Sequence, residues 1–181
     1  AGLGVGGIAI GLAAQGIFSD LFAGISILFD RPFKVGEMIS FGDSMGTVEQ
    51  IGMRTTRIRL VTGELLIVSN KNLLDKEIRN VTGRDHIRLS FMLGVTYETP
   101  PATLAAIPEM LREMGEAEGV KVARAGFDGF GESSLDFAYI LDVPGADWTV
   151  AHPLRDRILV AIMNRFAAEG INLAYPTQTS Y

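Results

Sequence analysis

Residues 1–19 read AGLGVGGIAIGLAAQGIFS and contain no charged side chain. Three kinds of side chain recur there at intervals of four residues: Gly7 and Gly11, Ile8 and Leu12, and Ala9 and Ala13. At about 100° per residue, they form three stripes along a helix, with the large side chains between glycine and alanine. Small residues let helices pack closely. The pattern therefore predicts a ring of identical helices, with the large stripe directed at the ring axis.

The length and apolarity of this run favour a membrane-spanning helix over residues 1–16. About 20 apolar residues are needed to cross a bilayer, whereas a helix in a soluble core usually keeps a polar face. Gln15 is the only strongly polar side chain before Ser19. A buried apolar helix in a soluble binding module is the alternative. A secretory signal fits poorly, because no basic residue precedes the run. Since the chain starts inside this run without an initiating Met, we expect further membrane segments upstream.

The same residues also contain a nucleotide-binding motif. Gly2, Gly4 and Gly7 have the G-x-G-x-x-G spacing, and Asp30 lies at roughly the distance of a ribose-binding acid. That fingerprint needs a strand directly before it and a helix with a solvent-facing side. Ala1 leaves no room for the strand, and residues 8–14 show no polar side. A soluble dinucleotide-binding module is thus an alternative function that the following segments do not favour.

Composition limits the other possibilities. The chain has 181 residues and no cysteine, which excludes thiolate metal sites and disulfide scaffolds. A net charge of −5 gives no broad basic field for nucleic acid, although Arg54, Arg57 and Arg59 cluster locally. Such a cluster on a strand usually forms a solvated face. We therefore expect no nucleic-acid partner.

Residues with catalytic or metal-binding chemistry are scarce. The two histidines, His86 and His152, are far apart in sequence and lack metal-ligand spacing. Three carboxylates, those of Asp128, Asp136 and Asp142, have no visible basic or nucleophilic partner in the sequence. The expected protein is not an enzyme and has no cofactor, catalytic residue or metal ligand.

The segment after Gly16 changes character. Ser19, Asp20 and Ser26 appear among aromatic and aliphatic residues, which is typical of an amphipathic helix over residues 17–30. Because glycine weakens a helix locally, we expect a kink at Gly16. The apolar face of residues 17–30 has two possible sites, the membrane surface or the next domain. Arg31 and Lys34 favour a cytoplasmic location for the residues after about 30.

Residues 31–82 predict a small all-β barrel or sandwich. Short alternating segments, EMISF, GTVEQIGM, RTTRIRLV and ELLIV, are separated by turns, and Thr62-Gly63 predicts a tight hairpin. Residues 83–181 predict strand, helix, strand, strand, helix and strand, an α+β ferredoxin-like domain with a C-terminal tail. Its first helix is expected to be capped by Thr99 and kinked by Pro108, and Thr149 is expected to lead into the second helix.

Four motifs in this order resemble the small-conductance mechanosensitive channel (MscS) family. They are GLAAQG, AGISILFDRPFKVGE, GTVEQIGMRTTRIR and LLIVSN, and the similarity runs from about Gly4 to Pro176. The resemblance implies an ion channel of the bacterial inner membrane that responds to osmotic stress. It further implies a homoheptamer in contact with lipid, a pore lined by the first helix, and a cytoplasmic vestibule whose end barrel includes the tail.

The resemblance also assigns roles to individual residues. Ile8 and Leu12 match the hydrophobic pore constriction, Gly16 matches the kink, and four small residues match the packing faces: Gly7, Ala9, Gly11 and Ala13. Asp20 and Asn70 match a contact between the kinked helix and the β-domain that is associated in the family with inactivation. The chain departs from the family there, since Asp20 replaces a frequent asparagine and Ser69 a frequent proline.

Overall fold

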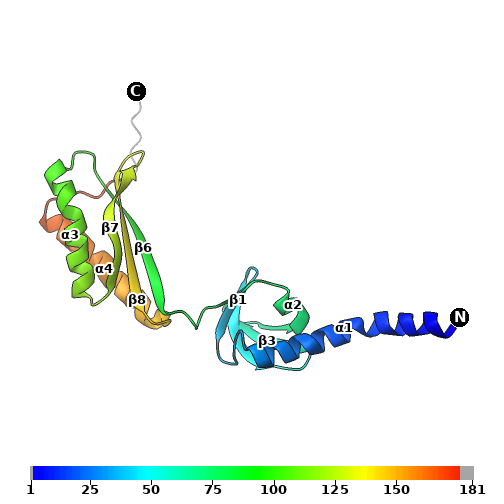
Figure 1. The fold of residues 1–181 in the computed structure, drawn as a ribbon. Helices are drawn as coiled ribbons and strands as arrows, with labels where there is room; N and C mark the ends of the chain where they lie inside the picture. Colours follow the sequence, from blue (N-terminus) through cyan, green and yellow to red (C-terminus); the bar gives the residue numbers. More distant parts are fainter. Residues whose placement is uncertain (1, 176–181) are drawn as a thin grey trace. The chain divides into compact units, whose positions relative to one another are not determined.

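A computed structural model describes residues 2–175 of the chain, and the side chains of residues 7, 8 and 10–175. The chain forms two compact units, Ala1–Arg84 and Asp85–Tyr181, each with its own hydrophobic core (Figure 1). The division lies within two residues of the predicted boundary between the β-domain and the α/β domain.

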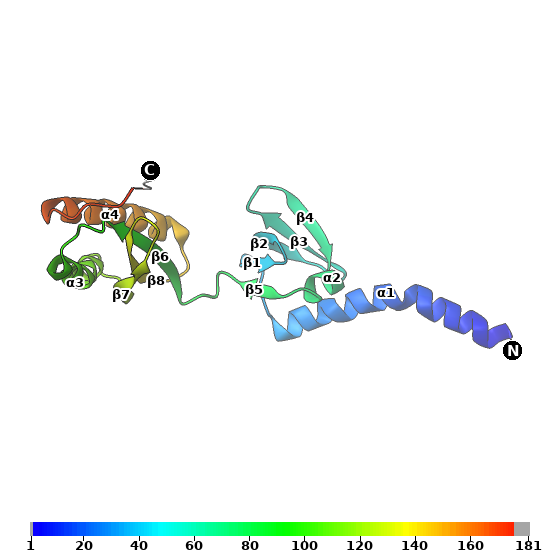
Figure 2. The ribbon, with the colours of Figure 1, turned by 90° about the horizontal axis from the view of Figure 1, so that it is seen from above.

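The first unit begins with α1 (Gly2–Asp30), one continuous helix of 29 residues (Figure 2). The predicted division into separate helices before and after Gly16 is therefore not seen, because glycine weakens a helix without removing a backbone donor. A bend within the continuous helix stays a prediction. Next to Gly16, the Ser19 hydroxyl donates to the Gln15 carbonyl at 2.9 Å, a bond that often accompanies helix bending. The helix ends where Arg31 adopts a left-handed φ of 47° before Pro32.

The predicted β-domain is a five-stranded antiparallel sheet. Its elements are β1 (Met38–Phe41), β2 (Ser44–Ile51), β3 (Thr55–Leu60), β4 (Leu65–Ser69), α2 (Asn70–Leu74) and β5 (Ile78–Asn80). The strand order is β4-β3-β2-β1-β5. The predicted turn at Thr62-Gly63 joins β3 to β4, with a φ of 102° at Gly63 that favours glycine. The sequence did not predict α2 or β5, which are short and rich in polar residues.

The C-terminal part of α1 belongs to the core of the β-domain. This core consists of almost fully buried residues: Ile27, Phe33, Ile39, Phe41, Val48, Ile58 and Leu73. Gly24 and Ile27, one turn apart on α1, are buried against the sheet domain. Phe22, Leu28 and Phe29 on the same segment stay exposed, so the next domain covers only part of residues 17–30, and the membrane surface stays a prediction for the rest.

The second unit contains β6 (His86–Val95), α3 (Pro101–Ala117), β7 (Lys121–Phe130), β8 (Leu135–Pro144) and α4 (Trp148–Ala168). These elements follow the predicted order, and their sheet order is β6-β8-β7. Leu111 of α3 and Ile158 of α4 share one core with Tyr139 of β8. The expected last strand consists of a single bridge between Val95 and Leu173.

Two predicted helix starts are wrong in detail. Thr99 does not cap α3, because its hydroxyl donates to the Thr96 carbonyl at 2.7 Å; Pro100 occupies the cap position. In α4, Asp147 is the cap and accepts from the Thr149 amide at 2.8 Å. The helix α3 continues through Pro108, so the expected kink there does not end it.

Candidate functional site

The large side chains near the start of α1 are exposed in the single chain. Ile8 and Leu12 are each 65% exposed, and the segment Ile10–Asp30 is long and apolar enough to cross a membrane. Of the residues in the most apolar 18-residue stretch of this segment, only 17% are buried by the rest of the chain. Because a core helix would be covered by its own chain, the alternative of a buried helix in a soluble module does not fit α1.

The small-residue stripes of α1 are also open. A side-chain carbon added at Gly7 or Gly11 would meet no other atom within 4 Å, and Ala13 is exposed. The side chain of Ala9 lies outside the described residues. The described part of α1 therefore presents one bare glycine stripe beside its large-residue stripe. No contact among the described residues explains why glycine stands at these positions.

The dinucleotide alternative is contradicted by the backbone. Gly2, Gly4 and Gly7 all lie inside α1 rather than in a turn between a strand and a helix. A dinucleotide-binding unit also needs parallel strands joined by the helix, whereas α1 leads into an antiparallel sheet.

The predicted contact between α1 and the β-domain is present, with different partners. Asp20 Oδ1 accepts from the backbone amide of Lys71 at 3.2 Å, one residue beyond Asn70. The Asn70 side chain is fully buried and engaged within the β-domain: its Oδ1 accepts from the Thr56 hydroxyl at 2.8 Å. Its Nδ2 donates to the carbonyls of Gly52 and Met53 at 2.9 and 3.1 Å. Asp20 and Asn70 thus lie at one junction, but no hydrogen bond joins their side chains.

Two residues of this junction were missed by the sequence reasoning. Thr56 is a polar residue of β3, yet it is fully buried, and Asn70 satisfies its hydroxyl. Gly24 is buried on α1, and a side-chain carbon there would lie 2.4 Å from the Met53 carbonyl oxygen. The sequence contains an indication of each: Thr56 faces the same side of its strand as the inward-facing Ile58, and Gly24 interrupts an apolar helical segment.

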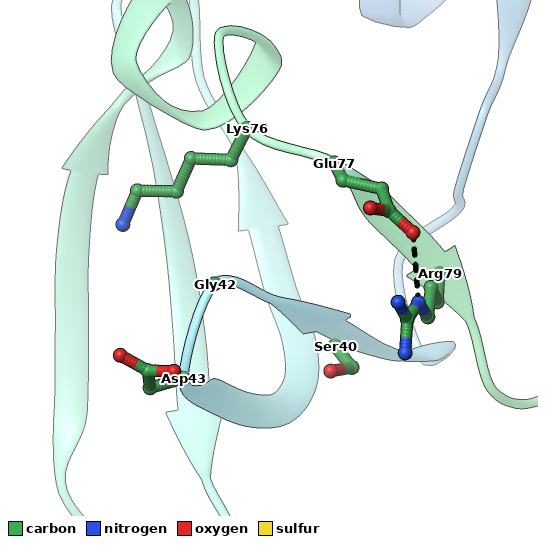
Figure 3. Close-up of a pocket in the computed structure, with 6 residues that line it drawn as sticks. All are labelled: Ser40, Gly42, Asp43, Lys76, Glu77 and Arg79. Carbon is green, nitrogen blue, oxygen red and sulfur yellow. Dashed lines mark hydrogen bonds and ion pairs between the residues drawn. The ribbon is translucent and has the colours of Figure 1, made fainter.

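A hollow of about 480 Å³ in the β-domain does not resemble a catalytic site. Its lining combines two basic and two acidic side chains with small residues: Ser40, Gly42, Asp43, Lys76, Glu77 and Arg79 (Figure 3). Glu77 and Arg79 form an exposed ion pair at 2.9 Å. Exposed pairs of this kind contribute little energy, and the hollow is a charged surface feature.

The expectation that the carboxylates of the second unit lack a basic partner was wrong for two of them. Asp142 has a basic partner, since it accepts from Arg88 Nε and Nη2 at 2.8 and 3.0 Å, and His86 Nε2 lies 3.5 Å away. The bond from Arg88 holds the pKa of Asp142 below its ordinary value. Asp128 likewise pairs with Arg124 at 2.7 Å. These partners come from neighbouring strands or from residues four positions away, and they form structural pairs on a sheet.

The other titratable groups do not assemble a reactive centre. The rings of His152 and Trp148 lie 5.0 Å apart on α4, on a different element from His86. Among residues 2–175, the structure brings together no group of three side chains suited to a metal ion. The arrangement with the clearest functional character is therefore α1 and its junction with the β-domain.

Comparison with known proteins points to one family. A family profile described as "Mechanosensitive ion channel, beta-domain" matches residues 16–83. The whole chain is 37% identical to the small-conductance mechanosensitive channel MscMJ of Methanocaldococcus jannaschii, covering 52% of it. Over 98% of the chain, it is 29% identical to the low conductance mechanosensitive channel YnaI of Escherichia coli, covering 53% of it. The chain thus spans about half the length of these relatives.

Solved structures share the fold. The closed-state crystal structure of Helicobacter pylori MscS has the same fold over 99% of this chain, with a TM-score of 0.81 at 23% identity. The matched region covers 70% of the Helicobacter pylori chain. The cryo-EM structure of Arabidopsis thaliana MSL1 has the same fold over 96% of this chain, with a TM-score of 0.80 at 20% identity. The matched region covers 64% of the MSL1 chain. Sequence identities this low show only that the fold is shared.

Proposed function

This chain belongs to the MscS family of mechanosensitive channels, and from that premise we propose that it is part of the subunit of a tension-gated ion channel. The observation that carries the proposal is the exposed stripe of Ile8 and Leu12 beside the bare glycines of α1. The channel opens a pore when membrane tension rises and so releases osmotic pressure. It acts as a conduit for ions rather than as an enzyme, and it uses no cofactor.

The uncharged part of α1 has the dimensions of a membrane crossing. Residues 2–19 span about 27 Å as a helix, close to the roughly 30 Å of a bilayer's hydrocarbon core. Arg31 and Lys34 follow at the end of α1, where basic residues favour the cytoplasmic side. We therefore assign the protein to the bacterial inner membrane, with residues after about 30 in the cytoplasm. Its partners are lipid, permeating ions and further copies of itself, and not nucleic acid.

The pore itself is a ring of seven copies of α1. In this ring, the glycine stripe of Gly7 and Gly11 packs against the alanine stripe of Ala9 and Ala13 on the next copy. The ring directs Ile8 and Leu12 toward the axis. A narrow passage lined by these side chains offers water no hydrogen bonds, so it dewets and blocks ions without a plug. Tension widens the ring, while Gly16 is the position at which the helix bends away from the pore.

The two cytoplasmic parts build a vestibule below the pore. The five-stranded domain joins α1, and the second unit adopts a ferredoxin-like arrangement, in which β8 is central and the Val95–Leu173 bridge stands for the fourth strand. Ions pass between neighbouring subunits to reach the pore. The expected end barrel would involve residues 176–181, which lie outside the described residues.

Replacing Leu12 by serine in the full protein tests this function. Leu12→Ser hydrates the constriction, so patch recordings should show opening at clearly lower tension than in the wild type. A matched control is Ile10→Ser, because Ile10 lies about 160° of helical rotation from both Ile8 and Leu12 and is 72% exposed. The control removes a similar apolar side chain from the side of α1 opposite the pore, and it should leave the threshold near that of the wild type.

The recordings separate three outcomes. A lower threshold in Leu12→Ser alone supports a constriction at that residue. Equal thresholds in the wild type and Leu12→Ser would contradict the assignment of the pore-lining stripe. A wild-type protein without tension-gated current in patches that contain it would contradict the function itself.

A further inference from the structure

The charged hollow of the β-domain lies between two parts of the chain that are far apart in sequence. One wall is β1 with the turn that joins it to β2, and the other is the segment that leads from α2 into β5 (Figure 3). The two walls are joined by the pairing of β1 with β5, in which Ser40 lies directly opposite Arg79. The hollow is therefore bounded by paired strands and not by loops alone.

The turn between β1 and β2 supports the Lys76 side chain. Gly42, with a φ of 54°, and Asp43 form a two-residue turn between the paired residues Phe41 and Ser44. A side-chain carbon at Gly42 would lie 3.7 Å from both Cδ and Nζ of Lys76. The Lys76 ammonium also lies 5.7 Å from the centroid of the buried Phe41 ring, within the range of cation–π attraction. These contacts hold the ammonium beside the hollow.

The charges around the hollow are balanced, and two of them are unpaired. Glu77 and Arg79 form an ion pair with each other at 2.9 Å. Among the described residues, neither the Lys76 ammonium nor the Asp43 carboxylate has an ion-pair partner. Figure 3 shows these two groups on one side of the hollow, with Glu77 and Arg79 across from them. The hollow thus offers one positive and one negative group that its own residues leave unpaired.

From this arrangement we propose that the hollow binds a small zwitterion of the amino-acid class. The carboxylate of the ligand pairs with Lys76 and its ammonium group with Asp43, while the Ser40 hydroxyl offers a hydrogen bond. An ion of one sign is attracted by one of the two charged groups and repelled by the other, whereas a zwitterion is attracted by both. The volume of about 480 Å³ lies within the range of small-molecule sites.

The exposure of the site limits its affinity. Lys76 and Asp43 are both exposed, and water and salt weaken the attraction between exposed charges. We expect a dissociation constant on the order of 1–10 mM, so the site responds to solutes that reach millimolar concentrations. The inference concerns the β-domain alone. It goes beyond the proposed channel function, because no step of pore opening enters it.

Three small molecules test the class of ligand. L-Alanine carries both charges, propionate lacks the ammonium group, and ethylammonium lacks the carboxylate. Saturation-transfer NMR of the full protein in deuterated detergent, at pH 7 and constant ionic strength, detects binding through the methyl protons that all three molecules have. L-Alanine should bind in the millimolar range, and each of the other two should bind at least about fivefold more weakly.

Two variants test the charged groups separately. Lys76→Gln and Asp43→Asn each remove one charge and keep a polar side chain, so the affinity for L-alanine should fall about fivefold in either protein. Lys71→Gln and Asp75→Asn are the matched controls, because these two residues pair with each other and do not line the hollow. Both controls should bind L-alanine as the wild type does. All four side chains are exposed, so unchanged melting temperatures are expected.

Each outcome decides the inference. Preferential binding of L-alanine, weakened in Lys76→Gln and Asp43→Asn but not in the controls, supports it. Equal binding of propionate and L-alanine overturns the zwitterion, and so does equal binding of all three molecules. An unchanged affinity in Lys76→Gln or in Asp43→Asn overturns the site, as does the absence of a signal from L-alanine at about 20 mM, above the expected dissociation constant. Since the measurement involves no current, a protein that fails to gate would overturn the proposed function alone.

Discussion

At the scale of single residues, Tyr139 has an unusual environment. Its hydroxyl is the buried side-chain polar atom without a hydrogen-bond partner among the described residues, and the residue is fully buried on β8. An unsatisfied buried hydroxyl costs on the order of 1–3 kcal/mol. We expect Tyr139→Phe to raise the free energy of unfolding of the second unit by about 1 kcal/mol. Denaturant titration monitored by Trp148, the single tryptophan, measures this unit.

Tyr139 also predicts a dependence on alkaline pH. Burial raises the pKa of Tyr139 from 10.0 to about 12, so the folded state keeps a proton that the unfolded state loses. The corresponding stability is complete below about pH 10 and is lost as the pH rises toward 12, about 3 kcal/mol in all. This loss should be absent in Tyr139→Phe.

A second tyrosine provides the control. The Tyr97 hydroxyl donates to the Gly131 carbonyl at 2.7 Å, so Tyr97→Phe removes a bond that is made. It should lower the unfolding free energy slightly, by up to about 1 kcal/mol, the opposite sign to Tyr139→Phe. Equal effects at the two positions would contradict the assignment of an unsatisfied hydroxyl.

Residue-level prediction from the sequence succeeded where local chemistry decides the outcome. Gly63 was correctly predicted in a tight turn, because only glycine readily adopts its positive φ. The burial of Thr56 was not predicted, because a threonine on a half-buried strand fits either face, and its hydroxyl is satisfied by Asn70, fourteen positions away. The roles of Ile8 and Leu12 stay predictions, since their proposed partners are other copies of the chain.

At the scale of elements, the proposed ring predicts that the small residues of α1 determine how closely two copies of the helix approach. Gly11→Leu adds a large side chain on the packing face and should prevent the ring from closing, whereas Gly11→Ala should reduce its stability only partly. The mass of the detergent-solubilised assembly, measured for both variants, is the readout. The expected wild-type protein component is seven subunits. A wild-type mass in Gly11→Leu, together with wild-type gating, would contradict the small-residue argument.

The elements themselves were predicted unevenly. The strands β6, β7 and β8 have ten residues each, and their alternation and turns made them recognisable. The elements α2 and β5 have five and three residues, too few for a periodic signal. The start of α3 was misjudged because Thr99 and Pro100 both suit a helix start, and the Thr96 carbonyl competes for the Thr99 hydroxyl.

At the scale of the whole molecule, charge is divided unequally between the two units. The second unit carries seven Lys and Arg against thirteen Asp and Glu, a net charge of −6, so the first unit has a net charge of +1. In the proposed assembly, seven copies of the second unit surround the vestibule through which ions reach the pore. A strongly acidic enclosure attracts cations and repels anions over about one Debye length. The hydrophobic constriction at Ile8 and Leu12 contributes no such preference.

This distribution predicts a cation preference that weakens as salt increases. Under a KCl gradient, the reversal potential of the open channel should lie toward the potassium equilibrium potential in dilute solution and move toward zero near 1 M, where the Debye length falls to about 3 Å. Removing acidic charge from the second unit, with Glu116→Gln and Glu132→Gln together, should reduce the preference. The matched double change Asp43→Asn and Glu77→Gln, at two exposed acids of the first unit, should have a smaller effect. A chloride preference, or one independent of salt, would show that the vestibule charge does not control permeation.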